Sequence, residues 1–400
     1  MGETTLHDLP REKITEILTR LPSEYAIEGK EVCKTWKNIL HHIKREKKIN
    51  LLFEGEYVLP GRTQLYYGEY DEKSSKTIQE QLSYDALTPL GYPDFHYTNR
   101  LIVGSHRGLV CFVMNNKDLG EQFDYDDPIF ICNPFTKETV RLPPPPRKLV
   151  SLPKDEKKVW DDDFSVIGFG YLYSTNEYKI VRIYYDENSR KYYKKNSSKF
   201  CKGQIQVYTL GGKRGGWRNI GITNHYFFKY DFANGILFDG ALHWVTYFGS
   251  EIVAFHLADE KFRSVRIPPR VGKGGYQSAR LLLLGGNLSI ALMKHPPRNA
   301  TSVDRTSTDI WSFKPMKDHK LEGSYEFTIH AKECHPSICY PFALKEVNTN
   351  KVLLWHMGRG PTLGHYDTET GSLDEFADER LSISSDSVHE ERCFIKSTGA

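Results

Sequence analysis

Long apolar runs are missing from this sequence, and so is a strong charge of either sign. No stretch approaches the ~18–20 apolar residues of a transmembrane helix, which excludes a membrane span of that kind. The N-terminus is polar, so we expect no secretory signal peptide. The formal net charge of +3 is too small to indicate a nucleic acid or an acidic surface as a partner. The sequence therefore predicts a cytoplasmic or nuclear protein without a membrane partner.

Catalytic motifs are also missing. There is no G-x-S-x-G sequence of the kind that presents a nucleophilic serine. Glycines such as Gly168, Gly170 and Gly211 are typical of hairpin turns, and none of them opens a helix after a strand to hold a phosphate group. We therefore predict no catalytic residue and no cofactor.

The cysteines do not form a recognisable framework. Their number, seven, is odd, and in a reducing compartment they are expected to be free thiols. Cys334, His335 and Cys339 lie close together near His330, but a structural zinc site needs a second ligand pair, so no metal is predicted. The seven positions are Cys33, Cys111, Cys132, Cys201, Cys334, Cys339 and Cys393.

Two kinds of charged stretch have more than one interpretation. Cations and aromatics alternate from Arg190 to Lys202, as in a groove for single-stranded nucleic acid, but a solvated loop between strands is the more ordinary interpretation. The acidic stretches 124–127 and 161–163 can be interpreted as a solvated rim or as a surface that attracts a basic substrate. They lack the ligand spacing of an EF-hand, so calcium is not indicated.

An amphipathic helix is predicted near the N-terminus, between Leu9 and Pro22. Its apolar residues fall at i, i+3, i+4 and i+7, which places them in one stripe. Pro10 suits the first turn because a proline there loses no hydrogen bond, and Pro22 ends the helix because the residue before a proline avoids the α region. The stripe consists of Ile14, Ile17, Leu18 and Leu21.

A second amphipathic segment follows and ends in the basic stretch 41–48. Helices this short bury little surface by themselves, so the module at residues 1–48 needs the rest of the chain or a partner to cover it. The apolar side of the second segment consists of Val32, Trp36, Ile39, Leu40 and Ile43.

Short strands are predicted throughout residues 49–400. Aromatic and β-branched runs alternate with Gly, Pro, Asn and Asp, and they group in fours over roughly 40–55 residues, which is the rhythm of propeller blades. There is no regular WD dipeptide, and Gly285-Gly286 is the only double glycine at a kelch-like position. The predicted sets of four are 101–104, 108–113, 129–132 and 139–142; 164–170, 178–185, 205–210 and 217–220; 235–238, 241–247, 252–257 and 262–267; 280–284, 288–293, 309–313 and 325–329; and 338–344, 351–356, 364–367 and 372–376.

A closing strand is predicted around 392–397. Pairing with N-terminal material near 51–59 would complete a ring of about six blades. The predicted fold is therefore mainly β with a small α module, in which N-terminal helices precede a β-propeller-like domain.

Two regions of the sequence carry a resemblance to a known family. The pattern LP-x-x-x-I-x-x-I-L-x-R-LP over 9–22, followed by VCKTW at 32–36, resembles a plant F-box. The segments GLVC at 108–111, DPIFICNP at 127–134 and ETVRLP at 138–143 resemble a type 3 F-box-associated domain. The resemblance implies that residues 1–48 dock on a Skp1-like adaptor and, through it, on a cullin. The residues it implies for this surface are Leu9, Pro10, Ile14, Ile17, Leu18, Leu21, Pro22, Val32 and Trp36.

The function implied by the resemblance is the substrate-recognition subunit of a Skp1–cullin–F-box ubiquitin ligase, which is not itself an enzyme. The propeller face would hold an unknown protein substrate. One alternative is a propeller scaffold or ligand-binding protein that does not dock on Skp1, because Gly29 and Glu31 depart from the F-box pattern. Another is a propeller hydrolase or carbohydrate-active enzyme, which would need converging carboxylates or a metal that the sequence does not display.

Overall fold

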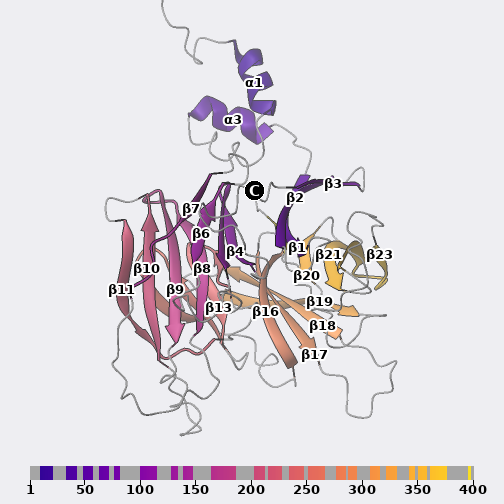
Figure 1. The fold of residues 1–400 in the computed structure, drawn as a ribbon. Coiled ribbons are helices and arrows are strands. Elements are labelled where there is room, and N and C mark those ends of the chain that lie inside the picture. The colour runs from indigo at the N-terminus through magenta and orange to yellow at the C-terminus, as the bar shows by residue number, and fades with distance from the viewer. Residues whose placement is uncertain are drawn as a thin grey trace, which may run out of the picture.

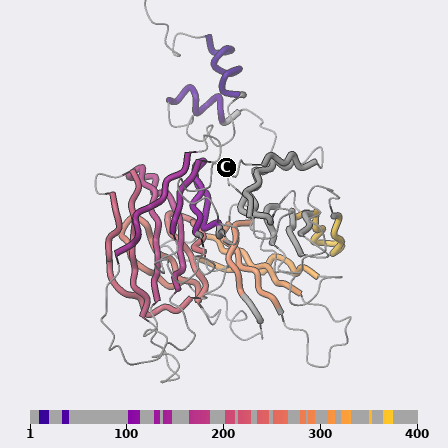
Figure 2. Tube along the Cα trace, viewed as in Figure 1, coloured from indigo at the N-terminus to yellow at the C-terminus, as the bar shows by residue number. Residues whose placement is uncertain are grey.

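The structure is a computed structural model of the 400-residue chain. Figure 1 shows the described segments in colour, and Figure 2 shows a part of them in colour as a tube along the chain. No helix in these segments is long and apolar enough to cross a membrane. The structure describes residues 10–20, 33–42, 48–56, 63–71, 76–81, 100–114, 128–133, 138–146, 164–185, 202–211, 215–227, 234–246, 251–265, 276–284, 287–294, 307–315, 321–330, 342–346, 350–357, 361–375 and 395–397.

Two helices form a pair near the N-terminus, α1 (Arg11–Arg20) and α3 (Lys34–His42). Pro10 lies just before α1, one position earlier than predicted, and its carbonyl accepts hydrogen bonds from the amides of Lys13 and Ile14. The bond from Ile14 is the first regular i+4 bond of the helix, and the bond from Lys13 satisfies an amide of the first turn that would otherwise have no partner. Figure 1 shows the two helices outside the sheets.

The remaining described elements form six four-stranded antiparallel sheets, in agreement with the predicted mainly β, propeller-like fold of about six blades. Blade 1 contains β4 (Arg100–His106), β5 (Leu109–Met114), β6 (Ile129–Cys132) and β7 (Thr139–Arg141). Blade 2 contains β8 (Phe164–Leu172), β9 (Glu177–Tyr185), β10 (Gly203–Leu210) and β11 (Gly216–Thr223). Blade 3 contains β12 (Ile236–Phe238), β13 (Ala241–Val245), β14 (Ile252–His256) and β15 (Lys261–Val265).

The other three blades have the same four-stranded form. Blade 4 contains β16 (Tyr276–Leu284), β17 (Asn287–Lys294), β18 (Ser307–Pro315) and β19 (Leu321–His330). Blade 5 contains β20 (Phe342–Glu346), β21 (Lys351–Met357), β22 (Pro361–Asp367) and β23 (Leu373–Glu375). Blade 6 contains β1 (Lys48–Glu56), β2 (Thr63–Asp71), β3 (Lys76–Gln81) and β24 (Ile395–Ser397).

The blades follow one another through their first strands. β4 lies against β8, β8 against β12, β12 against β16, β16 against β20, and β20 against β24. The order within each sheet makes these strands one edge of their blade, so the series traces the inner side of a propeller. In Figure 1, the β8–β11 sheet lies on the left and the β16–β19 and β20–β23 sheets lie on the right.

Blade 6 joins the first and the last of the described strands. β24 pairs antiparallel with β1, and Phe53 lies opposite Ile395 while Leu51 lies opposite Ser397. This pairing confirms the predicted closing strand. It gives the sheet the order β24-β1-β2-β3, so β24 supplies its inner strand.

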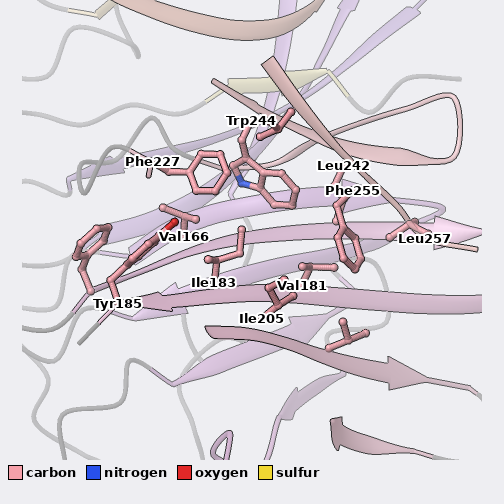
Figure 3. Packing of buried hydrophobic residues seen from close by; sticks show 13 residues of the cluster. Val166, Val181, Ile183, Tyr185, Ile205, Phe227, Leu242, Trp244, Phe255 and Leu257 are labelled. Atoms are coloured by element: carbon pink, nitrogen blue, oxygen red, sulfur yellow. The ribbon is translucent and has the colours of Figure 1, made fainter. Parts of the chain in front are cut away.

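The hydrophobic core lies between the blades. Figure 3 shows the cluster in which Val181 and Ile183 of blade 2 face Phe255 and Trp244 of blade 3. Comparable clusters join blade 1 to blade 2, blade 3 to blade 4, and blade 4 to blade 5. Blades 1 to 5 therefore bury apolar side chains between one another, as face-to-face sheets do.

Two glycines predicted to mark a hairpin turn lie instead inside β8. Gly168 forms a bridge with Gly235, and a Cβ on either would come within 2.7 Å or 2.5 Å, respectively, of the Trp244 ring. A Cβ on Gly170 would come within 2.9 Å of Leu237 and Leu257. The turn prediction was wrong here because glycine also serves strands that other groups approach closely.

An ionic cluster joins blades 2 and 3. The Lys179 ammonium lies 2.8 Å from a Glu260 carboxylate oxygen and 2.7 Å from the Leu257 carbonyl. Both guanidinium Nη atoms of Arg218 donate to the same carboxylate, at 3.0 and 2.7 Å. Burial alone would raise the pKa of Glu260, but the hydrogen bonds from Arg218 and Lys179 and their charges hold it below its usual value of 4.5. The glutamate is thus ionised where the two blades meet.

Candidate functional site

The helix pair has a small apolar core. Ile14 and Leu18 of α1 pack against Ile39 and Leu40 of α3, and all four are buried. The half-buried Trp36 packs against the same cluster. Helix α3 thus covers part of the α1 stripe, and these residues support the pair from within.

One member of the α1 stripe is not covered. The Ile17 side chain is 41% exposed, although it lies between two positions whose side chains are buried. Pro10, at the start of the helix, is exposed as well. An exposed isoleucine beside a buried stripe offers apolar area to a partner at no cost to the packing of α1 on α3.

The remaining residues implied for the adaptor surface cannot be placed in the same way. Leu9, Leu21, Pro22 and Val32 lie outside the described residues. Described neighbours support the second helix, because the Cys33 carbonyl accepts a hydrogen bond from the amide of Lys37. The Cys33 thiol also lies 3.5 Å from the Trp36 amide, which satisfies another donor of the first turn.

A second candidate surface lies on the propeller, where the β4–β5 hairpin of blade 1 meets the β8–β9 hairpin of blade 2. The guanidinium carbon of Arg107 is 4.6 Å from the ring centroid of Tyr171 and 5.5 Å from that of Tyr173. Arg107 donates a hydrogen bond to the Tyr171 hydroxyl, which in turn donates to Asn176. We call Arg107, Tyr171 and Tyr173 the arginine–tyrosine cluster.

His106 lies beside this cluster without adding charge to it. Its ring centroid is 5.5 Å from that of Tyr171 and 5.9 Å from that of Tyr173. Burial, and then the neighbouring Arg107 charge, lower the pKa of His106 to about 4. The imidazole is therefore neutral at pH 7, and the cluster carries the charge of Arg107.

Sequence patterns did not indicate the arginine–tyrosine cluster. Its residues come from two hairpins that are separated in the chain, and only the packing of β4 on β8 brings them together. The one local indication is the Arg107-Gly108 pair between two apolar runs, which is a turn signal and not a binding motif.

The other sequence candidates lie largely outside the described residues. These include Cys334, His335 and Cys339, as well as both acidic stretches. The backbone amide of His330, at the end of β19, donates a 3.2 Å hydrogen bond to the Tyr366 hydroxyl. Within the described segments, no group of three or more His, Cys, Asp or Glu residues could hold a metal ion.

The sequence of this chain is similar to those of F-box proteins from a plant. F-box protein At3g07870 of Arabidopsis thaliana is 26% identical over 284 residues, which cover 66% of this chain and 61% of that protein. F-box protein CPR1 of the same plant is 22% identical over 360 residues, which cover 83% of this chain and 75% of that protein. The match therefore spans less than two thirds of the length of the first of these relatives.

Solved structures match this chain only at low similarity. The periplasmic gluconolactonase PpgL of Pseudomonas aeruginosa is 10% identical with a TM-score of 0.39, covering 88% of this chain and 100% of that one. A TM-score this low supports no conclusion about activity. The model of the F-box associated beta propeller domain, in contrast, matches residues 71–375, from the last residue of β2 to the end of β23. Since this match covers most of the chain and five whole blades, the chain belongs to the F-box-associated β-propeller family.

Proposed function

We propose that this chain is the substrate-recognition subunit of a Skp1–cullin–F-box ubiquitin ligase. The observation that carries the proposal is an exposed isoleucine, Ile17, on a helix pair that precedes a propeller of the F-box-associated family. The helix pair would bind a Skp1-like adaptor and, through it, a cullin. The propeller would bind the protein substrate, and no membrane or nucleic-acid partner is required.

In this mechanism the chain brings the substrate close to the ubiquitin-conjugating enzyme and does not itself make or break a covalent bond. Holding adaptor and substrate on one chain raises the effective concentration of substrate lysines near the ubiquitin-conjugating enzyme. The chain then needs no catalytic residue of its own. A cytoplasmic or nuclear location, where such ligases and their substrates meet, follows from this role.

A substitution at Ile17 can weaken adaptor binding without disturbing the folding of the helix pair. Ile14 and Leu18 are buried against α3, so changing them would disturb the helix pair itself. Ile17→Asp instead places a charge on the exposed side of α1 and leaves that packing intact. Full burial of an apolar side chain of this size contributes about 1.5–3 kcal/mol, and the 41% of Ile17 that is still exposed corresponds to about 0.6–1.2 kcal/mol of it. The aspartate also brings a charge that is costly to desolvate, so the variant should bind the adaptor at least roughly tenfold more weakly.

The measurement is co-purification and affinity with a recombinant Skp1-like protein. Ile222→Asp is the matched control, because Ile222 is 63% exposed on β11 and lies far from the helix pair in sequence. We expect wild type and Ile222→Asp to bind equally, and Ile17→Asp to bind weakly. Failure of the wild-type chain to bind any Skp1 homologue would overturn the proposal and leave a propeller scaffold as the better description.

A further inference from the structure

A run of four prolines, Pro143 to Pro146, follows Leu142 and the outer strand β7 of blade 1. Proline fixes its own φ angle at about −65° and keeps the residue before it out of the helical region. The peptide bonds of this run are trans. The run therefore adopts a polyproline II helix, which has three residues per turn and no internal hydrogen bonds. Side chains three positions apart lie along one edge of such a helix, so the helix has three edges.

One edge of this helix is covered by the propeller. Leu142 and Pro145, three positions apart, are both buried. Leu142 belongs to the core cluster that joins blades 1 and 2, and the rings of Tyr208 and Trp217 pack against that cluster with their centroids 5.3 Å apart. Aromatic side chains also line the grooves in which other proteins bind proline-rich segments. Blade 2 thus holds the run in the way that such a groove does.

Two hydrogen bonds from blade 2 hold the main chain of the run. The Trp217 indole N–H donates to the Pro143 carbonyl at 2.7 Å. The Gln206 side-chain amide donates to the Pro146 carbonyl at 2.8 Å. These two carbonyls are also three positions apart, as expected for a polyproline II helix. The Gln206 side-chain oxygen accepts a 2.8 Å hydrogen bond from Arg182, which fixes the orientation of the amide. A segment held in this way loses little entropy when it binds a partner.

The other two edges of the helix are exposed. Pro143 and Pro146 lie on one of them and Pro144 lies on the other, and we call these three residues the exposed proline face. The hydrogen bonds from blade 2 use only carbonyls, which any residue supplies. They therefore do not require proline at the exposed positions. Two exposed residues of β7, Val140 and Arg141, extend the surface at the start of the run.

We propose that the exposed proline face binds a partner domain of the SH3 kind, whose groove is lined with aromatic side chains, and that an acidic rim of this groove meets Arg141. Such grooves bind segments in which two residues separate two prolines, as they separate Pro143 from Pro146. They also exploit a polyproline II helix that is already formed, which the contacts with blade 2 provide. A negative rim complements the cation that precedes the run. The proposal goes beyond the ligase function and does not rest on it.

The probe is a set of purified SH3 domains, some with acidic and some with neutral rims beside the groove, and each is titrated with the full-length chain. Pro143→Ala combined with Pro146→Ala is the test variant, because alanine keeps both carbonyls and removes ring carbons from one exposed edge. Pro145→Ala is the matched control, because it makes the same change on the buried edge. Circular dichroism at the temperature of the binding measurement shows whether each variant is folded.

The wild-type chain should bind domains with an acidic rim, and more tightly than a free peptide of residues 140–146 does, because the run is already ordered. The double variant should bind at least roughly tenfold more weakly, since the lost ring carbons remove apolar area from the contact. Pro145→Ala should leave the affinity nearly unchanged and lower the unfolding temperature, because its cavity lies inside the protein. Arg141→Gln should weaken binding by a smaller factor than the double variant. The proposal fails if no domain binds the chain, if only neutral rims bind, if the free peptide binds more tightly than the chain, or if the double variant binds as the wild type does.

The two proposals fail separately. The double proline variant should still co-purify with the Skp1-like protein, and Ile17→Asp should keep the wild-type affinity for the SH3 domain. Failure of every SH3 domain to bind would refute the proline-face proposal and leave the ligase function standing. Binding of an SH3 domain without adaptor binding would instead refute the ligase function and leave the exposed proline face as a docking surface.

Discussion

Replacing Glu260 should destabilise the propeller far more than replacing an ordinary surface glutamate. The side chains of Lys179 and Glu260 are only 7% and 17% exposed, so Glu260→Gln leaves a buried ammonium without its counter-charge. Removing one partner of a buried ion pair costs about 3–5 kcal/mol. We expect the lower end, about 3 kcal/mol, because glutamine still offers an oxygen and the Leu257 carbonyl still accepts from Lys179.

The neighbouring pair Asp259–Arg263 supplies the control. Its side chains are 39% and 42% exposed, and exposed pairs contribute about 0–1 kcal/mol. Asp259→Asn should therefore cost less than about 1 kcal/mol. Both variants would be compared with wild type by urea unfolding followed by circular dichroism, with equal m values as the check that the unfolding transition is the same.

A double variant tests whether the buried charge is the cause. Lys179→Met combined with Glu260→Gln removes both charges and fills the site with a side chain of similar volume. It should cost about 1–2 kcal/mol, less than Glu260→Gln alone, because what is left is a Leu257 carbonyl without its donor and an Arg218 guanidinium, 42% exposed, without its carboxylate. The reasoning is refuted if Glu260→Gln costs no more than Asp259→Asn, or if the double variant is less stable than Glu260→Gln.

Three further predictions follow from packing, titration and a contact between blades. Gly235→Ala should destabilise by about 1–3 kcal/mol in thermal unfolding, because its methyl group would overlap the Trp244 ring, and Trp244→Phe should relieve part of that cost when combined with it. Burial lowers the pKa of His243 to about 4. As the pH falls, this histidine is protonated in the unfolded chain before it is protonated in the folded one, so the free energy of unfolding decreases from about pH 6.5 toward about pH 4. Between pH 7.5 and pH 5, the His243→Gln variant should therefore lose about 2 kcal/mol less stability than the wild type. Trp217→Phe removes the 2.7 Å hydrogen bond from the indole N–H to the Pro143 carbonyl and should cost about 0.5–1.5 kcal/mol by urea unfolding.

The sequence predicted blades 1 to 5 because their hairpins are marked locally. Strands such as β6 and β14 are short apolar runs bounded by turn residues, and a four-strand rhythm needs no knowledge of distant contacts. Blade 6 was harder to predict. Polar residues fill β3 (Lys76–Gln81), so only the closing pair β1–β24 was anticipated and the strands β2 and β3 were not.

Features that depend on packing between elements were not predictable in the same way. Gly168 has the same local signature in a turn and in a strand, and only the position of Trp244 in another blade decides between them. Ile14 and Ile17 belong to one stripe, yet α3 covers the first and not the second. The arginine–tyrosine cluster likewise needs β4 and β8 to be neighbours before it exists.

The pairing of β24 with β1 sets the order of events during synthesis. β1 leaves the ribosome early, whereas Ile395 and its neighbours leave it after every other described strand. The strands of blades 1 to 5 can pair as soon as they have emerged, and each blade buries its apolar side chains once the next blade packs against it. The inner edge of blade 6 must wait, with the backbone groups of β1 open to wrong partners until the last strand arrives. A stop codon just before Ile395 would therefore yield a chain with nearly all of its blades and a permanently open ring.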